Sequence, residues 1–384
     1  MSNTLIRTGT GLFNLLLSKY TDSNKQDFGG NKIVDVLQME MVYGLQGPPT
    51  VSFSQDPSGG IKISFLFSQM QLQLFEYRNG ERGNLQGTYQ VPVTVTGLLA
   101  LKGSAFTMTN LEAVPAAVGS LDEKVAKLFN EQIVPQFQKQ MSSVPLPDLG
   151  KVIGVPIAMQ GLYLENGALH LQAQAGGSGG NAVLPPEPET GAVIAVAIAS
   201  DFIHDMAASG FPGASAHAGA KKSKSGFGYD GEARASADQT NVWIADGAGY
   251  GTLRVSASAK GGIEVFGKWV EPDISVSTHT PALNLKLITD HTAHKAIAKV
   301  SMDGSVSFDF GLPGVLEKAA DSILSLIKPL AGEITNAINA GLDQVNITMF
   351  TLPEQVPGTD LSAGLNFRQL GFYGNSAYAV IEIA

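Results

Sequence analysis

Few side chains in this sequence have the types and spacing that metal binding requires. His291 and His294 lie three residues apart, with Asp290 beside them and His279 upstream. Histidines at this spacing share one face of a helix and can ligate a metal ion together. Because no metal-binding motif of a known type surrounds them, the sequence favours a solvated polar turn or helix. We therefore predict no metal site.

A glycine pattern between Gly226 and Gly231 has the spacing of a dinucleotide-binding loop. Such a loop follows a strand and begins a helix. Here the pattern follows a lysine- and serine-rich run and precedes further Ser/Ala-rich sequence, so it favours a flexible loop or an edge hairpin. The sequence also lacks a P-loop. We expect no bound cofactor, no catalytic residues and no enzymatic activity.

The basic side chains are sparse, and their distribution bears on the choice of partner. The formal net charge is −9, from 25 basic and 34 acidic residues, so the chain lacks the electrostatic footprint of a nucleic-acid-binding protein. The basic run consists of Lys221, Lys222 and Lys224. It favours a solvated loop, and the alternative is a transient contact with anionic head groups at a membrane surface.

The composition describes a large, charge-poor globular chain. Its 384 residues are 44% hydrophobic and only 15% charged, against about a quarter charged in typical domains. At roughly 150 residues per domain, two domains are expected. The absence of cysteine excludes disulfides and thiolate zinc sites.

The apolar segments are too short for a membrane-spanning helix. No apolar run approaches the ~20 residues that such a helix needs. Only Arg7 precedes the short apolar run Leu15–Leu17 near the N-terminus, which favours a native helix over a signal peptide. We expect a cytoplasmic protein, or one exported without a conventional signal peptide.

A Gly/Ser-rich stretch followed by a Pro-rich stretch divides the chain into two similar halves. The predicted domains are residues 1–178 and 189–384, joined by a linker at 179–188. Each half shows a helical segment, alternating strands and a long amphipathic helix. The predicted helices are 5–20, 121–141, 200–209 and 315–343. The predicted strands are 61–67, 72–75, 91–96, 193–198, 253–259, 263–265, 274–276 and 283–287.

Matching features in the two halves indicate an internal duplication. Pro135 and Pro329 each lie inside a long predicted helix, and aligning them keeps the apolar stripes in phase. Each half also ends on a similar strand pattern, at 161–168 and at 371–377. The common order favours a duplicated unit. The alternative is that two unrelated α+β domains look alike at this level of detail.

The segments 193–203 and 146–171 resemble parts of the tubular lipid-binding (TULIP) superfamily. The first, VIAVAIASDFI, is similar to the strand and helix that open the second domain of bactericidal/permeability-increasing protein and lipopolysaccharide-binding protein. The second is similar to the end of their first domain. The chain departs from these secreted proteins, because it has no cysteine and no cluster of lipopolysaccharide-binding cations. A bacterial or intracellular branch fits better, such as the accessory proteins of clostridial neurotoxin clusters.

The resemblance implies an α+β fold of two tandem tubular domains, together shaped like a boomerang. In each domain a highly curved antiparallel sheet would wrap a long helix and leave an apolar groove beside it. The alternative for each groove residue is ordinary core packing. The implied lipid-binding residues are Leu12, Leu16, Phe129, Ile133 and Phe137 in the first half, and Phe202, Met206, Ile323, Ile327 and Leu330 in the second.

The resemblance also implies a function without chemistry. Such a protein would bind and transfer a phospholipid or another acyl ligand, because burial of each CH₂ group contributes about 0.8 kcal/mol without precise polar contacts. The alternative is a structural or interaction protein of the same fold with closed tubes, for example an accessory component of a toxin-associated complex.

Overall fold

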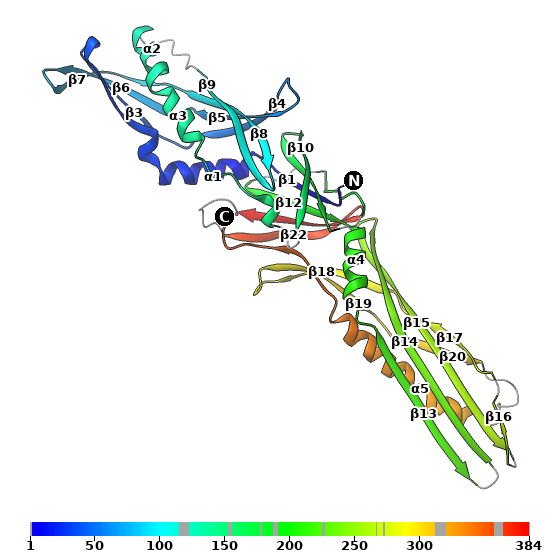
Figure 1. Ribbon diagram of the computed structural model, residues 1–384. Coiled ribbons are helices and arrows are strands. Elements are labelled where there is room, and N and C mark those ends of the chain that lie inside the picture. The colour runs from blue at the N-terminus through cyan, green and yellow to red at the C-terminus, as the bar shows by residue number, and fades with distance from the viewer. Residues whose placement is uncertain are drawn as a thin grey trace.

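The computed structural model describes residues 2–114, 123–152, 156–176, 179–186, 191–224, 227–265, 267–271, 273–311, 320–356 and 364–383. The fold is α+β, with mostly antiparallel sheet and few helices. Figure 1 shows an elongated arrangement in which a central sheet separates the elements of residues 10–152 from those of residues 200–351.

The central sheet has six antiparallel strands that come from both halves of the sequence. Their order is β10 (Ile157–Glu165), β11 (Ala168–Ala175), β1 (Thr4–Thr8), β12 (Val193–Ala199), β23 (Ser376–Ile383) and β22 (Leu365–Tyr373). Each half therefore contributes its first strand and its last two strands. The two first strands, β1 and β12, pair with each other at the middle of the sheet.

Strand β12 is buried along its whole length, as its uninterrupted run of Val, Ile and Ala residues predicts. Ile194, Val196 and Ile198 face the main core. The alternate residues face a smaller cluster that includes Ala182 and Leu184 of the interdomain segment. That segment is fixed by hydrogen bonds from Ala182 N–H to the Ser2 carbonyl (3.1 Å) and from Val183 N–H to Ser376 Oγ (2.9 Å). Residues 179–186 thus pack as a strap on the central sheet.

Between its shares of the central sheet, the first half forms two four-stranded sheets and three helices. One sheet has the order β2-β3-β6-β7, and the other has the order β4-β5-β8-β9. Their strands are β2 (Gly29–Val34), β3 (Met39–Leu45), β4 (Thr50–Gln55), β5 (Ile61–Phe67), β6 (Met70–Arg78), β7 (Glu81–Gln90), β8 (Val93–Lys102) and β9 (Ala105–Val114). The helices are α1 (Thr10–Ser23), α2 (Glu123–Gln132) and α3 (Val134–Met141), with 3-10 turns at Lys25–Phe28, Asp35–Leu37 and Leu149–Val152.

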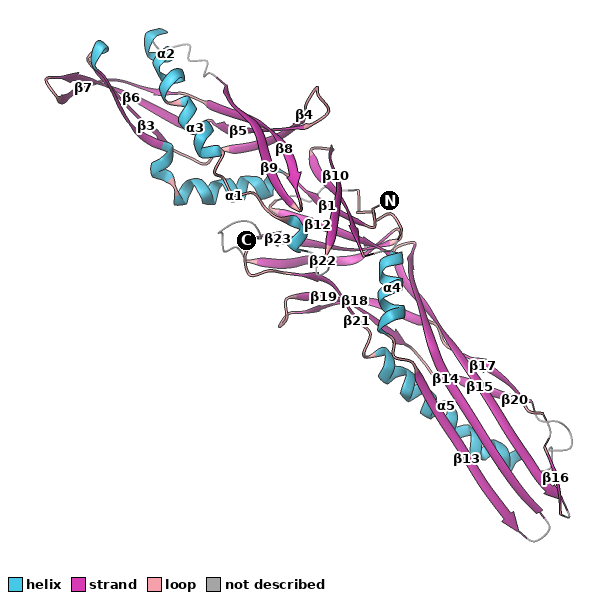
Figure 2. Ribbon diagram, viewed as in Figure 1, coloured by secondary structure: helices cyan, strands magenta, loops and turns pink. Residues whose placement is uncertain are grey.

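The second half is built on long strands that curve beside one long helix (Figure 2). Its main sheet has the order β13-β14-β15-β18-β19-β21, with β16 added to β15, and β17 pairs separately with β20. The strands are β13 (Ala214–Lys224), β14 (Phe227–Ala245), β15 (Ala248–Val265), β16 (Lys268–Val270), β17 (Ser275–His279), β18 (Leu283–Asp290), β19 (Lys295–Met302), β20 (Ser307–Gly311) and β21 (Asn346–Thr351). The helices are α4 (Ser200–Gly210) and α5 (Ala320–Leu342).

Two helix predictions differ from the structure. The helix predicted at 5–20 begins at Thr10, because the preceding residues form β1, which pairs with a strand on each side. The helix predicted at 121–141 is broken into α2 and α3, with Pro135 in the first turn of α3, where its missing N–H costs little. Helix α5 instead continues through Pro329.

The side chain of Asn3 joins β1 to the end of β11 inside the central sheet. Its Nδ2 donates to the Ala175 carbonyl and its Oδ1 accepts from the Ala175 N–H, both at 2.6 Å. Asn3 is fully buried. We expect Asn3→Ala to lower the free energy of unfolding by roughly 2–4 kcal/mol, since it leaves two buried backbone groups without these partners. Urea denaturation measures this loss, and Gln172→Ala, at an exposed position of β11, should cost far less.

His170 gives the central sheet a dependence on pH. It lies opposite Arg7 and Tyr163, stacks on the Tyr163 ring at 4.9 Å and is only 7% exposed. Burial lowers the pKa of the His170 imidazole below its ordinary value of 6.5, and Arg7 adds to this effect while Glu165 opposes it. As the pH falls, His170 therefore takes up a proton in the unfolded chain at a higher pH than in the folded chain. Acidification below about pH 6.5 should then destabilise the fold.

His170→Gln should remove this contribution. As the pH falls from 7.5 to 5, we expect the melting temperature of the variant to rise relative to that of wild type. A difference that stays constant over this range would contradict the assignment.

Candidate functional site

The five groove residues predicted in the first half are all buried. Leu12 and Leu16 lie on α1. Phe129 lies on α2, Phe137 lies on α3, and Ile133 lies between these two helices. Leu12, Phe129 and Ile133 have no exposed surface, and Leu16 and Phe137 are exposed by 3% and 2%. A side chain bordering a space large enough for an acyl chain would retain accessible surface. Each of these residues therefore contacts protein on nearly every side, and a ligand-binding role for them stays a prediction.

Aromatic rings fill the space beside these helices. The ring of Phe137 lies 5.0 Å from that of Phe67 and 5.9 Å from that of Phe28. The ring of Phe13 lies 5.1 Å from Phe53 and 5.5 Å from Phe106. Edge-to-face and tilted contacts at these distances are typical of a well-packed protein core. The first-half interior is closed around the predicted residues.

The predicted residues of the second half are in different environments. Phe202 is buried on α4, close to the backbone of Gly176. Met206, one turn further along α4, is 37% exposed. Leu330 on α5 is fully buried. Ile323 and Ile327 belong to α5, but their side chains lie outside the described residues.

The sheet face towards α5 is lined by alanine over a large part of β13, β14 and β15. In the strand register Ala216, Ala235 and Ala257 form one row across the three strands. Ala218, Ala233 and Ala259 form the next row on the same face. The two alanines of the middle strand are buried, whereas the four on the outer strands are only half-buried. The sequence analysis did not predict this face; its signal in the sequence is alanine at every second position of each strand.

Strands β17 and β20 pair with each other and lie beside β15 at the border of this region. Val276 pairs with Phe310, and Thr278 pairs with Phe308. Phe308 and Phe310 pack against the core but remain half-buried, and Val276 is also half-buried. The Thr278 hydroxyl donates to the Val255 carbonyl at 3.4 Å, which ties β17 to β15. We call the region between α5, the alanine rows and β17–β20 the alanine groove.

The alanine groove is closed where α5 approaches the central sheet. Ile334, Ile338 and Leu342 continue the apolar stripe from Leu330, and all are at most 1% exposed. Gly341 lets the helix approach the ring of Phe211 and the backbone of Gly213, where a Cβ would meet the ring at 2.9 Å. Packing is therefore tight at this end of α5, whereas the alanines of β13 and β15 keep accessible surface.

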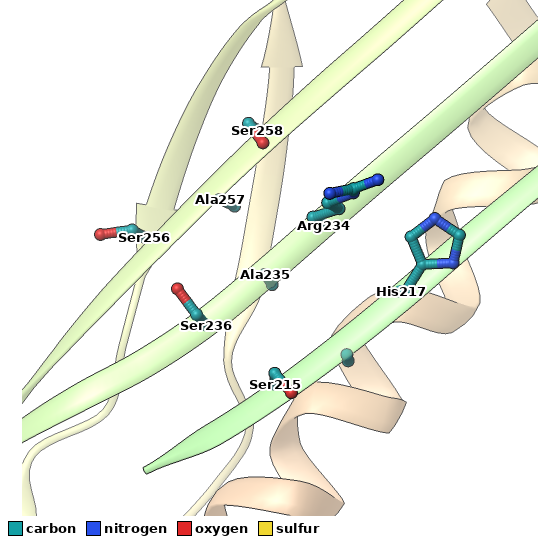
Figure 3. A pocket seen from close by; sticks show the side chains of 9 residues that line it. Ser215, His217, Arg234, Ala235, Ser236, Ser256, Ala257 and Ser258 are labelled. Carbon is teal, nitrogen blue, oxygen red and sulfur yellow. The ribbon is translucent and has the colours of Figure 1, made fainter.

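A hollow of about 830 Å³ lies against the same three strands. Figure 3 shows its serine, histidine and arginine side chains on one side of the strands, and Ala235 and Ala257 on the side of α5. His217 Nε2 lies 3.6 Å from Glu232 Oε1, and Arg234 forms an ion pair with the same carboxylate. The polar lining consists of Ser215, His217, Arg234, Ser236, Ser256 and Ser258. It offers hydroxyl groups and two basic side chains that already contact Glu232.

The other sequence motifs lie on turns and hairpins. His291 and His294 are in the turn between β18 and β19, where the Asp290 carboxylate accepts from the N–H groups of Thr292 and Ala293. The described residues contain no cluster of three or more potential metal ligands. Gly226 of the glycine pattern lies outside the described residues. Residues 227–231 belong to β14, so the rest of the pattern is strand and not helix.

The basic run belongs to the end of β13. Lys221 Nζ lies 3.2 Å from the Asp230 carboxylate of the neighbouring strand, whereas the side chains of Lys222 and Lys224 lie outside the described residues. None of the helices in the described part of the chain is long and apolar enough to cross a bilayer.

Comparison with known proteins finds similarity at the level of structure. No protein-family model and no curated protein matches the sequence. Among solved structures, lipopolysaccharide binding protein is 11% identical, with 100% of this chain and 99% of that chain covered and a TM-score of 0.43. P47 from Clostridium botulinum A2 is 10% identical, with 98% and 96% covered and a TM-score of 0.44. P47 of Clostridium botulinum E1 is 8% identical, with 98% of both chains covered and a TM-score of 0.45.

The closed first-half interior leads to a test at Ile133. We expect Ile133→Trp to lower the free energy of unfolding by about 1–3 kcal/mol, because the larger side chain overpacks a filled core. Chemical denaturation measures the change. Lys139→Trp, at an exposed position of α3, should stay within about 0.5 kcal/mol of wild type. If Ile133→Trp were equally neutral, a cavity would have to lie beside it.

Proposed function

We propose that this protein binds an acyl ligand, such as a phospholipid, in the alanine groove of its second half, and that it performs no chemistry. The observation that carries this proposal is the contrast between the two interiors. The first is filled by phenylalanine rings, whereas the second has a face of methyl groups that is only half-buried over β13 and β15.

The physical basis is the fit between small side chains and a thin apolar ligand. Alanine removes little volume from the space between helix and sheet, so a chain of CH₂ groups can lie on the backbone surface. Burial of each CH₂ contributes about 0.8 kcal/mol, and Val276, Phe308 and Phe310 on the neighbouring β17–β20 pair add half-buried apolar surface. A ligand of this kind needs no precise polar partners.

In this proposal each half is a tubular unit, and the two units together form a boomerang-shaped protein that transfers its ligand. The order of elements supports a common origin of the units. Each half runs through a central strand, a helix, a long excursion of sheet, a further helical segment and a final two-stranded hairpin of the central sheet. A transient contact with a membrane would accompany loading.

A second candidate function is structural, and the closed first-half interior favours it. A protein of the same fold with both interiors filled would act through its surface, as a non-catalytic component of a larger assembly. The two candidates differ in one measurable property, which is uptake of an acyl ligand by the purified full chain.

Ala257→Phe tests the groove directly. We expect it to lower the affinity for a fluorescent phosphatidylcholine about tenfold or more, because the new ring occupies the space of several CH₂ groups. Ser258→Phe is the matched control, since it adds the same ring to the opposite face of β15 and should leave uptake unchanged. Thermal melting checks that both variants fold. Uptake that is equal in wild type and both variants would exclude the groove, and no uptake by wild type would favour the structural candidate.

A further inference from the structure

An aromatic pair on the outer face of the second-half sheet stands apart from the alanine groove. Trp243 on β14 and Tyr250 on β15 are direct cross-strand partners. Their rings are nearly parallel, with centroids 6.1 Å apart and an angle of 25° between the planes. They are 40% and 43% exposed, although Val242 and Ile244 on either side of Trp243 are buried in the core.

Uncharged hydrogen-bonding side chains surround this pair on the same face. The row of Trp243 and Tyr250 continues across the sheet through Asn284 on β18 and Ser301 on β19. The adjacent row on that face places Asn241 opposite Thr252. Because directly paired residues of antiparallel strands share one face, the rings lie among amide and hydroxyl groups. We call these six residues the aromatic platform.

The charges next to the platform are largely compensated. Arg254, two residues from Thr252, donates to the Asp238 carboxylate at 2.8 and 2.6 Å. Lys299 Nζ, two residues from Ser301, lies 3.0 Å from Asp343. Lys286 adds one exposed cation beside Asn284, and the Asn284 amide donates to the exposed carboxylate of Asp303. This balance differs from the clusters of cations that bind anionic membranes or acidic peptides, and it fits a neutral partner.

The platform is held rigidly before any ligand arrives. The β14–β15 turn uses Asp246 and Gly247 at positive φ, and the Gly247 N–H donates to the Gly374 carbonyl at 3.1 Å. Gly249 next to Tyr250 allows close approach of Leu285 and Phe372, where a Cβ would meet side-chain atoms at 2.7 and 3.2 Å. A fixed platform loses little conformational entropy on binding.

A role in hairpin stability alone does not account for this arrangement. A cross-strand aromatic pair contributes about 0.2–1 kcal/mol, which requires neither two exposed ring faces nor the amide and hydroxyl groups around them. A sugar ring has the complementary surface, with a face of C–H groups that stacks on an aromatic ring and a rim of hydroxyls that hydrogen-bond to amides and hydroxyls. We infer that the aromatic platform is a binding site for a neutral saccharide.

Intrinsic fluorescence provides a specific test, because Trp243 and Trp269 are the two tryptophans of the chain. In a Trp269→Phe variant, all tryptophan emission comes from the platform. Soluble neutral β-glucan, mannan and xylan are the probes, with native-gel retardation as the second readout. We expect at least one of them to shift the Trp243 emission and to retard the protein in the gel.

Variants of the platform define the outcomes. Tyr250→Ala and Trp243→Ala should each weaken retardation at least tenfold, and Tyr250→Phe, which keeps the stacked ring, should retain most of it. Trp269→Ala is the matched control, since Trp269 is also exposed, by 44%, on β16. The inference is overturned if no polysaccharide binds, if binding survives Trp243→Ala and Tyr250→Ala, or if only phosphatidylcholine vesicles shift the emission, which would assign the rings to membrane contact. Thermal melts check that each variant folds.

Discussion

The antiparallel pairing of β1 with β12 is the constraint on which the rest of the structure depends. Each of these strands begins one half of the chain, and each is followed by a helix that leaves the central sheet and by a long excursion of strands. The last two strands of each half return to flank the pair, so both excursions are anchored at two points. Because β12 is buried on both faces, and the strap covers one of them, the anchor has no exposed apolar surface of its own. The regions of residues 10–152 and 200–351 can therefore differ in their interiors, although both are attached to the same central sheet.

The two interiors differ because their sheets carry side chains of different size. In the first half phenylalanine rings fill the space between helix and sheet. Phe13 contacts Phe106, and Phe67 contacts both Phe28 and Phe137. In the second half alanine occupies the corresponding face of β13, β14 and β15. Because alanine is small, α5 must approach this sheet closely if no space is to remain between helix and sheet. It does so near Gly341, where the helix has no side chain in the way. The alanines of β13 and β15 keep accessible surface, so the same helix-on-sheet architecture has one interior filled by aromatic rings and one lined by half-buried methyl groups.

Local patterns in the sequence predicted a minority of the strands, among them β5, β8 and β12, and the place of the long helices. They did so because period-two and period-four spacing reflects burial directly. They failed where a long-range partner decides the outcome. Leu5 continues an apolar pattern compatible with a helix, but pairing with β11 and β12 makes its segment a strand. Pro135 and Pro329 gave the same local signal, yet one falls in the first turn of a new helix and the other inside a continuous one. The alanine rows form only through the register of three strands, and no single segment shows that Ala216, Ala235 and Ala257 lie side by side.

The low charge of the chain has a structural reason that connects the groove with the outer surface. Strands that put alanine on one face need polar groups on the other, and here serine, threonine, asparagine and glycine take many of the positions that charged residues usually occupy. Hydroxyl and amide groups keep such a face hydrated without like-charge repulsion between neighbouring strands. On this polar face, Trp243 and Tyr250 are the large apolar side chains exposed on the described parts of β14 and β15. A pair of rings kept on a face that otherwise excludes large apolar groups is more readily explained by a ligand than by packing, since the core beneath is already filled by Val242 and Ile244.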